Sequence, residues 1–375
     1  MSKKKIVVLG TGMVGSAIAI DLNLDFDVTA VDINKNALEA LQQKHGIKTV
    51  QTDLSVSRNV VAVIRDQDLV IGAVPGFMGY QTVRNVIRTG KNMVDISFFP
   101  QDPFRLHDEA LSQDVTVVVD CGVAPGMSNI FLGYYDGVME VKSYRCLVGG
   151  LPKVREWPFE YKAVFSPMDV IEEYVRPARF IEHSGEVVRP ALSDAELVNF
   201  PGIGTLEAWN SDGLRTLLKT IKIPNMIEKT LRYPGTIDYL KMLRESGFFS
   251  YDEIDVNGKK IRPIDLTARL LFDQWKLNPG EEDFTVMRVE IAGNNKRGEA
   301  KLLIYDMFDQ YDRKSETTSM ARTTGYTCTA IARLMLDGKI EERGIVPPEY
   351  AGRNEENFNF ILSGLAERGI EYKLR

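Results

Sequence analysis

The stretch Gly10-Thr11-Gly12-Met13-Val14-Gly15 directly follows the short apolar run 5–9 and opens a segment with helical periodicity. A G-x-G-x-x-G pattern between a strand and a helix is typical of dinucleotide-binding domains, although the bare pattern also occurs by accident. The stretch therefore predicts a strand, a glycine turn and a helix as the first unit of an α/β domain.

Each glycine has a separate expected part in this turn. Gly10 permits the tight turn, Gly12 lacks the Cβ that would keep a pyrophosphate away, and Gly15 lets the helix pack close to the strand. Met13 ends the turn and Val14 begins the predicted helix, whose free N–H groups attract phosphate. We expect these five residues to bind a dinucleotide. The alternatives are a domain of this type that binds nothing or binds a different nucleotide.

The second predicted strand is followed at its end by an acidic residue, Asp32. A carboxylate at this place accepts hydrogen bonds from the ribose hydroxyls and repels a 2′-phosphate, so it favours NAD over NADP. Lys35 lies close in the sequence and would weaken that preference. NAD is therefore the expected cofactor.

The first 120 residues alternate β-branched runs with segments of helical length. This alternation predicts right-handed βαβ crossovers and a doubly wound parallel sheet of the Rossmann type. The expected strands cover residues 5–9, 26–31, 48–52, 68–73, 92–96 and 115–119. The expected helices cover residues 14–24, 36–44, 57–65, 81–89 and 103–112.

Other strand ends should complete the cofactor site, because ligands of such sheets lie across the carboxyl ends of the strands. Asp53 and Leu54 would border the adenine, and Val74 and Pro75 would run along the nicotinamide ribose. Asp53 has an alternative interpretation as a helix N-cap residue.

The segment 120–126 leaves the sixth predicted strand and contains two glycines and a proline. These residues restrict the backbone to an unusual path where a nicotinamide ring would lie. Val123 within the segment is expected to contact the cofactor, whereas Cys121 is expected to be a packed small residue.

After Gly126 the pattern changes to longer and alternating strands, expected at residues 141–148, 284–292 and 300–309. The polar turn 293–298 joins the last two as a hairpin, which is a mark of an antiparallel sheet. Helices are expected at 167–174, 213–220, 237–246, 263–274, 326–336 and 356–368. We therefore expect an α+β second domain with a mixed or antiparallel sheet.

The composition excludes several classes of protein. With 46 Lys+Arg against 52 Asp+Glu, the net charge is −6, which disfavours a nucleic-acid surface. No apolar run reaches the roughly 18 residues that a membrane helix needs. Three scattered cysteines indicate a reducing compartment, so we expect a soluble cytoplasmic protein. Neither these cysteines nor the three histidines have metal-ligand spacing, and no metal is expected.

Several motifs resemble the saccharopine dehydrogenase-like family, and more closely its L-lysine 6-dehydrogenase branch. They are the glycine turn and the segments 94–98, 120–129, 148–152, 159–162, 165–167, 171–174, 176–179, 211–215, 230–235 and 323–325. The resemblance extends over nearly the whole chain. It implies a Rossmann domain at 1–125, a substrate-binding and dimerisation domain at 126–323, and a segment at 324–375 that returns to the Rossmann domain.

The resemblance also implies a reaction, the NAD-dependent oxidative ε-deamination of L-lysine to allysine, which then cyclises to a piperideine carboxylate. A substrate carboxylate would need a guanidinium group and an ammonium would need a carboxylate. Arg215 and Arg232 are expected to bind the carboxylate, and Asp212 the ammonium. Asp212 and Arg215 have an alternative interpretation as a salt-bridged helix start.

The amine must lose a proton before hydride leaves, so the reaction needs a base. The three histidines occupy places typical of surface residues. The expected catalytic residues are therefore Asp120 and Asp95 at strand ends and Tyr161 in the second domain, with Lys162 as a further candidate.

Thr236 stands where lysine dehydrogenases usually have histidine, which leaves the substrate open. One alternative is a saccharopine or carboxyspermidine type of dehydrogenase that acts on a secondary amine. Another is an NAD-binding sensor without turnover. Because most soluble oligomers are symmetric dimers, we expect a homodimer. Its expected ligand besides the cofactor is a small-molecule amino-acid substrate.

Overall fold

A computed structural model describes residues 3–163 and 167–375 of the chain. The chain forms two compact units: unit 1 comprises Met1–Val138 and Ala321–Glu371, and unit 2 comprises Met139–Met320 and Tyr372–Arg375. Phe165 and Ser166, which belong to one of the resemblance segments, lie outside the described residues.

The strands of unit 1 that the structure describes form one parallel sheet in the order β17-β6-β5-β4-β1-β2-β3. Their bounds are β1 Lys5–Leu9, β2 Asp27–Asp32, β3 Lys48–Gln51, β4 Leu69–Gly72, β5 Met93–Asp95, β6 Thr116–Val118 and β17 Gly344–Val346. The residues of β4 are all buried, as expected for a strand that is covered on both faces. The predicted Rossmann-type sheet is confirmed, and its first six strands agree with prediction to within one residue at each end.

The helices of unit 1 come from both ends of the chain. They are α1 Met13–Asn23, α2 Lys35–His45, α3 Ser57–Ile64, α4 Gly76–Arg88, η1 Pro103–Leu106, α5 His107–Ser112, α6 Met127–Val138, α11 Ser319–Leu336, α12 Pro348–Gly352 and α13 Glu355–Glu367. The first two residues of α11 fall in unit 2.

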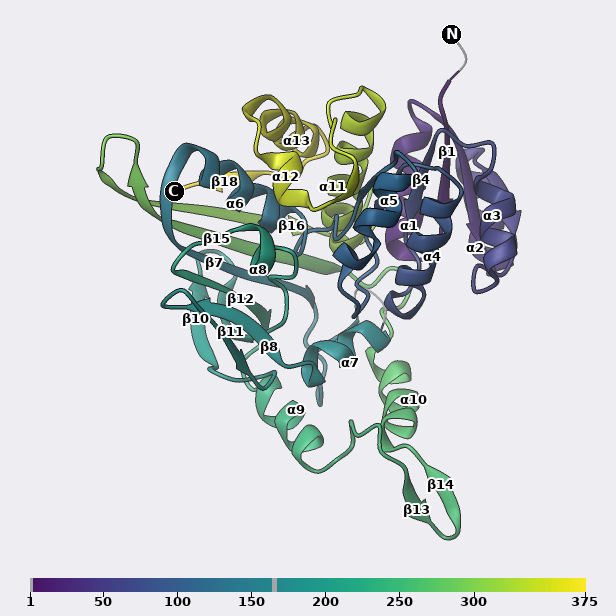
Figure 1. Ribbon diagram of the computed structural model, residues 1–375. Coiled ribbons are helices and arrows are strands. Elements are labelled where there is room, and N and C mark those ends of the chain that lie inside the picture. Colours follow the sequence, from purple (N-terminus) through teal and green to yellow (C-terminus); the bar gives the residue numbers. More distant parts are fainter. Residues whose placement is uncertain (1–2, 164–166) are drawn as a thin grey trace. The chain divides into compact units, whose positions relative to one another are not determined.

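Helix α6 belongs to unit 1, whereas the expected domain boundary at residue 125 placed it in the second domain. Close packing explains the difference, because a Cβ on Gly133 of α6 would lie 2.0 Å from the carbonyl oxygen of Glu349 in α12. Figure 1 shows these two helices side by side. Strand β17 then pairs in parallel with β6, so the late segment adds a strand to the first sheet.

Unit 2 is built on a mixed sheet, which confirms the predicted α+β class. Within the described chain its order is β10-β11-β12-β7-β15-β16-β18, and β8 pairs with both β12 and β9. The strands are β7 Met139–Pro152, β8 Ala178–Glu182, β9 Gly185–Arg189, β10 Glu196–Phe200, β11 Gly204–Asn210, β12 Asn225–Arg232, β15 Asp283–Asn295, β16 Ala300–Gln310 and β18 Tyr372–Leu374. The predicted β15–β16 hairpin is present, with Phe284 opposite Gln310.

The helices of unit 2 are α7 Pro167–Val175, α8 Leu217–Thr220, α9 Thr236–Glu245 and α10 Pro263–Trp275, and a small separate sheet consists of β13 Ile254–Val256 and β14 Lys259–Ile261. Helices α7, α9 and α10 pack around an aromatic core. Figure 1 shows β13 and β14 projecting beyond α10. Tyr174 of α7, Trp209 of β11 and Trp275 of α10 are buried together in the core.

Helix α8 is shorter than the helix expected over residues 213–220. Two backbone features prevent an earlier start. A Cβ on Gly213 would lie 1.4 Å from Glu228 Oε1, so this part of the chain is wrapped closely around the Glu228 carboxylate. Arg215 has a φ of 52°, in the left-handed region, which ends a right-handed helix.

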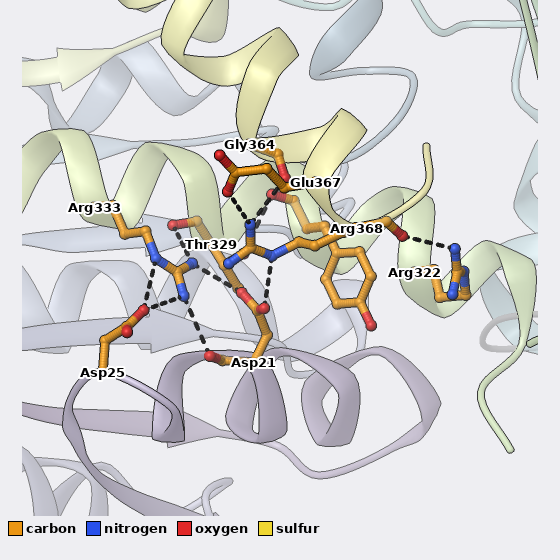
Figure 2. A network of polar contacts seen from close by, with 9 residues as sticks. Asp21, Asp25, Arg322, Thr329, Arg333, Gly364, Glu367 and Arg368 are labelled. Carbon is orange, nitrogen blue, oxygen red and sulfur yellow. Dashed lines mark hydrogen bonds and ion pairs between the residues drawn. The ribbon is translucent and has the colours of Figure 1, made fainter. Parts of the chain in front are cut away.

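A buried carboxylate links the late segment to the first helix of unit 1 (Figure 2). Asp21 of α1 accepts hydrogen bonds from Arg333 Nη1 of α11 at 2.8 Å and from Arg368 Nε, just after α13, at 2.6 Å. Arg333 also pairs with Asp25. The side chain of Asp21 is only 6% exposed, whereas that of Asp25 is 54% exposed. Asp21 is therefore the central residue of the network.

We expect Asp21→Asn to lower the free energy of unfolding by about 2–4 kcal/mol, because it removes the buried counter-charge shared by two largely buried guanidinium groups and leaves Arg333 only the exposed Asp25. The matched change Asp25→Asn should cost less than about 1 kcal/mol, because that carboxylate is largely in water. Urea unfolding followed by circular dichroism measures both. Equal effects of the two changes would contradict the central position of Asp21.

Candidate functional site

The glycine turn in unit 1 has the backbone contacts that the sequence predicts. Gly10 has a φ of 97°, and a Cβ there would lie 2.4 Å from the carbonyl oxygen of Ala73 at the end of β4. A Cβ on Gly15 would lie 2.0 Å from the carbonyl oxygen of Gly10. Since only glycine avoids these overlaps, the two positions bring α1 close to the ends of β1 and β4.

The third glycine lies beside open space. A Cβ on Gly12 would meet no atom within 4 Å, and Gly12 precedes α1 without a side chain to cap it. Met13 and Val14 form the first turn of that helix, and Met13 is exposed. Uncapped N–H groups beside open space suit a phosphate, so these residues fit a dinucleotide pyrophosphate.

Asp32 connects the end of β2 to the glycine turn. Its Oδ2 accepts a hydrogen bond from the Thr11 N–H at 2.6 Å, and its Oδ1 accepts one from the Asn34 N–H at 2.8 Å. Each oxygen retains a further lone pair with which it can accept a hydroxyl. The Asp32 carboxylate therefore fixes the glycine turn and can still accept hydrogen bonds from ribose hydroxyls.

The remaining candidate cofactor residues lie at the neighbouring strand ends. Leu54, Val74 and Val123 are buried, and Leu54 and Val74 belong to the core of the sheet. Pro75 is exposed at the start of α4. Asp53 accepts a hydrogen bond from the Ser55 N–H at 2.8 Å, and the side chain of Ser55, followed by this N–H, lowers the pKa of the Asp53 carboxyl. It makes a local turn rather than the helix N-cap, which is Val56.

Asp95 follows the same edge of the sheet but lies below its surface. It has no exposed area, and its Oδ2 accepts hydrogen bonds from Ser97 Oγ at 2.6 Å and Ser97 N at 3.2 Å. A Cβ on Gly72 of β4 would lie 2.0 Å from Asp95 Oδ1. Asp95 therefore packs against the backbone of β4, and contact with a substrate would require the surrounding chain to move.

Asp120 begins a tightly folded loop after β6. It is buried and has a φ of 53°, a left-handed conformation that aspartate adopts more readily than most residues. In the loop, the Gly122 N–H donates to the Pro125 carbonyl at 3.0 Å. Gly126 has a φ of 132°, and a Cβ there would lie 1.9 Å from the Gly122 carbonyl oxygen. The glycines thus give the loop the unusual path that the sequence predicts.

A cluster in unit 2 surrounds the buried guanidinium of Arg232, which is 2% exposed. It lies over the rings of Tyr161 and Trp209, 4.4 Å and 5.4 Å from their centroids. Its Nη2 donates to Tyr161 Oη at 3.3 Å and to Glu173 Oε2 at 3.0 Å. Two of the expected site residues, Tyr161 and Arg232, are therefore in direct contact.

Burial shapes the chemistry of this cluster. It raises the pKa of the Tyr161 hydroxyl well above its ordinary value, although the charge of Arg232 opposes the shift. The phenol is thus protonated at neutral pH and can donate a hydrogen bond, but it is a poor proton acceptor. Burial also raises the pKa of the Glu173 carboxyl, and Arg232 again opposes the rise.

The other two expected substrate residues have different neighbours. Both oxygens of Asp212 are engaged by Arg179, whose Nε and Nη2 donate at 2.8 Å and 2.9 Å. The structure does not pair Asp212 with Arg215, which lies buried in the turn that encloses Glu228. An ammonium at Asp212 would share the carboxylate with Arg179.

Sequence reasoning missed Glu173 and Trp209 as members of the Arg232 cluster. Glu173 lies in one of the resemblance segments, beside Ile171 and Tyr174, which face the core of unit 2. An acidic residue next to the buried face of a helix was the signal that could have identified it. No sequence pattern near Trp209 indicates its role, because β11 lies beside Arg232 only through its antiparallel pairing with β12.

Among residues 3–163 and 167–375, no three His, Cys, Asp or Glu side chains are grouped to hold a metal ion. Across the same residues, no helix is both long and apolar enough to cross a membrane.

The three cysteines are free and buried. His107, expected at the surface, accepts a hydrogen bond from the Ile345 N–H of β17 at 3.2 Å.

Comparison with known proteins agrees with this geometry. The sequence model of the saccharopine dehydrogenase NADP binding domain matches residues 6–118, and that of the saccharopine dehydrogenase C-terminal domain matches residues 122–370. The mitochondrial alpha-aminoadipic semialdehyde synthase of Bos taurus is 23% identical over 447 residues, which cover 99% of this chain and 48% of that protein. The chain therefore spans about half the length of this relative.

Two further proteins match over almost their whole length. The carboxyaminopropylagmatine dehydrogenase of Synechocystis is 22% identical over 396 residues, covering 98% of this chain and 96% of that protein. The structure of an L-glutamate-forming saccharopine dehydrogenase from Saccharomyces cerevisiae has a TM-score of 0.78 at 20% identity and covers 99% of both chains. With both family domains matched in order, the chain belongs to the saccharopine dehydrogenase family.

Proposed function

We propose that this protein is an NAD-dependent dehydrogenase that oxidises the CH–NH₂ group of an amino acid, with L-lysine as the leading substrate. The observation that carries the proposal is the glycine turn, where open space at Gly12 meets the uncapped start of α1. Membership of the saccharopine dehydrogenase family supports the amine as the oxidised group.

The proposed reaction is balanced as a two-electron oxidation. The carbon that bears the amine loses hydride, its nitrogen forms the iminium, water adds to the C=N bond, and ammonia and an aldehyde leave. When bound, the dinucleotide supplies the hydride acceptor. The protein must bind the phosphates at α1, hold the amine in its neutral form for hydride transfer and then admit the water that hydrolyses the C=N bond.

Asp120 remains our proposed proton acceptor, because it begins the loop where the nicotinamide is expected. Tyr161 suits a hydrogen-bond donor better than a base, since its pKa is raised by burial. Arg232 is proposed to support the substrate site through its contacts to Tyr161 and Glu173. Arg215 stays a proposed carboxylate ligand.

A second candidate is a dehydrogenase that acts on a secondary amine, as the names of the saccharopine and carboxyaminopropylagmatine relatives indicate for those proteins. Such a substrate has an additional arm that needs its own binding group. Arg176 and Arg179 are already paired with Glu172 and Asp212, which favours the smaller substrate. A sensor that binds NAD without turnover is the third candidate.

We also propose that the protein is a cytoplasmic homodimer. Its three cysteines are free and buried, which suits a reducing compartment. The dimer is the commonest arrangement of soluble oligomers.

The choice of substrate is testable with lysine, ornithine, saccharopine and diamines, each offered with NAD⁺ and NADP⁺. We expect NADH absorbance to rise with lysine and NAD⁺, and to rise much less with saccharopine. Turnover of saccharopine but not lysine would favour the second candidate. Nucleotide binding without turnover of any amine would favour the sensor.

The preference for NAD is testable at Asp32. We expect Asp32→Ser to move the ratio of kcat/KM for NAD⁺ and NADP⁺ toward NADP⁺ by about 10–100-fold, because one charge-assisted hydrogen bond contributes about 1.5–3 kcal/mol. The control Glu39→Ser removes an exposed charge nearby on α2 and should leave the ratio within about twofold. An unchanged ratio in Asp32→Ser would remove this residue from cofactor selection.

A further inference from the structure

Glu173 has one carboxylate oxygen engaged and the other open. It lies on α7, and its Oε2 accepts a hydrogen bond from Arg232 Nη2 at 3.0 Å. Within the part of the chain that the structure describes, Oε1 has no hydrogen-bond partner. The side chain is 23% exposed, in contrast to the 2% of Arg232. Oε1 is therefore on the accessible side of a buried ion pair.

The buried side of the pair holds the carboxylate in a fixed orientation. The Arg232 guanidinium donates through Nη1 to the carbonyl of Leu231 at 2.9 Å and lies over the rings of Tyr161 and Trp209. Because these contacts restrict Arg232, they also restrict the Glu173 oxygen bound to it. A preoriented carboxylate costs little entropy when it binds a ligand.

The charges around Glu173 favour a cation at Oε1. The largest charge acting on the carboxylate is that of Arg232, which is bound to Oε2 rather than Oε1. Asp169, one helical turn earlier, adds negative charge, and the charge of Arg176 opposes it. Arg176 is partly neutralised, because it pairs with Glu172 at 3.4 Å. Glu172 also accepts a hydrogen bond from the Tyr251 hydroxyl. The carboxylate of Glu172 is therefore engaged by Arg176 and Tyr251, in contrast to Oε1 of Glu173.

We propose that Glu173 Oε1 binds a primary ammonium group of the substrate and that Arg232 is the positioning residue behind it. The inference rests on the proposed amine substrate and refines it. A carboxylate at this point attracts a ligand with a free ammonium and repels a carboxylated arm. The protein is therefore selective for amines with a free primary ammonium at that position.

The test compares Glu173→Gln with the matched control Glu172→Gln on the same helix. Glutamine keeps an oxygen that can accept from Arg232 but has no charge to attract an ammonium. The dissociation constants of lysine, norleucine and 6-aminohexanoate are measured by isothermal titration calorimetry on the NADH-bound full chain. Norleucine lacks the ε-ammonium and 6-aminohexanoate lacks the α-ammonium.

We expect Glu173→Gln to weaken lysine binding by about 10–100-fold, as for a charge-assisted hydrogen bond, and Glu172→Gln to change it less than about twofold. The analogue that lacks the ammonium contacted by Glu173 should bind the wild type and Glu173→Gln equally. That analogue identifies the contacted group, which is the ε-ammonium if it is norleucine and the α-ammonium if it is 6-aminohexanoate. Glu173→Asp keeps the charge and should weaken lysine binding less than Glu173→Gln does. If Glu173→Gln does not fold, Glu173→Asp is compared with the wild type in its place.

Equal losses for lysine and both analogues would overturn the proposal, because they would indicate a general structural effect. An unchanged constant for lysine, or no binding of lysine to the wild type, would also overturn it. The failure of the proposed function is distinguished by turnover: lysine that binds through Glu173 without forming NADH leaves this inference intact and removes the dehydrogenase reaction.

Discussion

The close approach of α1 to the ends of β1 and β4 is the constraint on which the candidate cofactor site depends. It exists because Gly10 and Gly15 have no Cβ, and side chains there would overlap the carbonyl oxygens of Ala73 and Gly10. Burial of apolar strands can assemble the sheet, but it does not specify this distance. The two glycines do, and as a result the uncapped start of α1 faces the open space at Gly12, along the edge where Asp32 also ends its strand.

Charged groups in both units are held by counter-charges, with different consequences. In unit 1, both carboxylate oxygens of Asp21 accept hydrogen bonds, one from Arg333 and one from Arg368. Asp21 therefore connects the late helices to α1. In unit 2, Arg232 is enclosed by aromatic rings and holds only one oxygen of Glu173. A buried charge that loses its partner is costly, so both pairs are retained in the fold. Only the second pair leaves an oxygen for a ligand.

The parts of the structure that local sequence determines were predictable, and the parts that depend on distant pairing were not. Most of the strands β1 to β6 are short runs of β-branched and apolar residues, and their alternation with helical segments identifies them in order. Strand β17 is too short to show a pattern and forms because β6 offers it an edge. Similarly, Arg179 and Asp212 lie 33 residues apart, and nothing in either segment indicates that they pair. Glu173 lies beside the buried face of α7, but nothing in the sequence of β12 indicates that this helix supplies the counter-charge of Arg232.

The most direct test of the account is a fluorescence titration of NADH into the wild type and Gly12→Val. Since a Cβ at Gly12 meets no protein atom within 4 Å, the variant should fold like the wild type and lose only the space for a pyrophosphate. The account predicts saturable binding to the wild type and binding at least about 100-fold weaker to Gly12→Val, roughly the loss of two hydrogen bonds to a charged group. Equal affinities, or no binding to the wild type, would contradict the assignment of the glycine turn as the cofactor site.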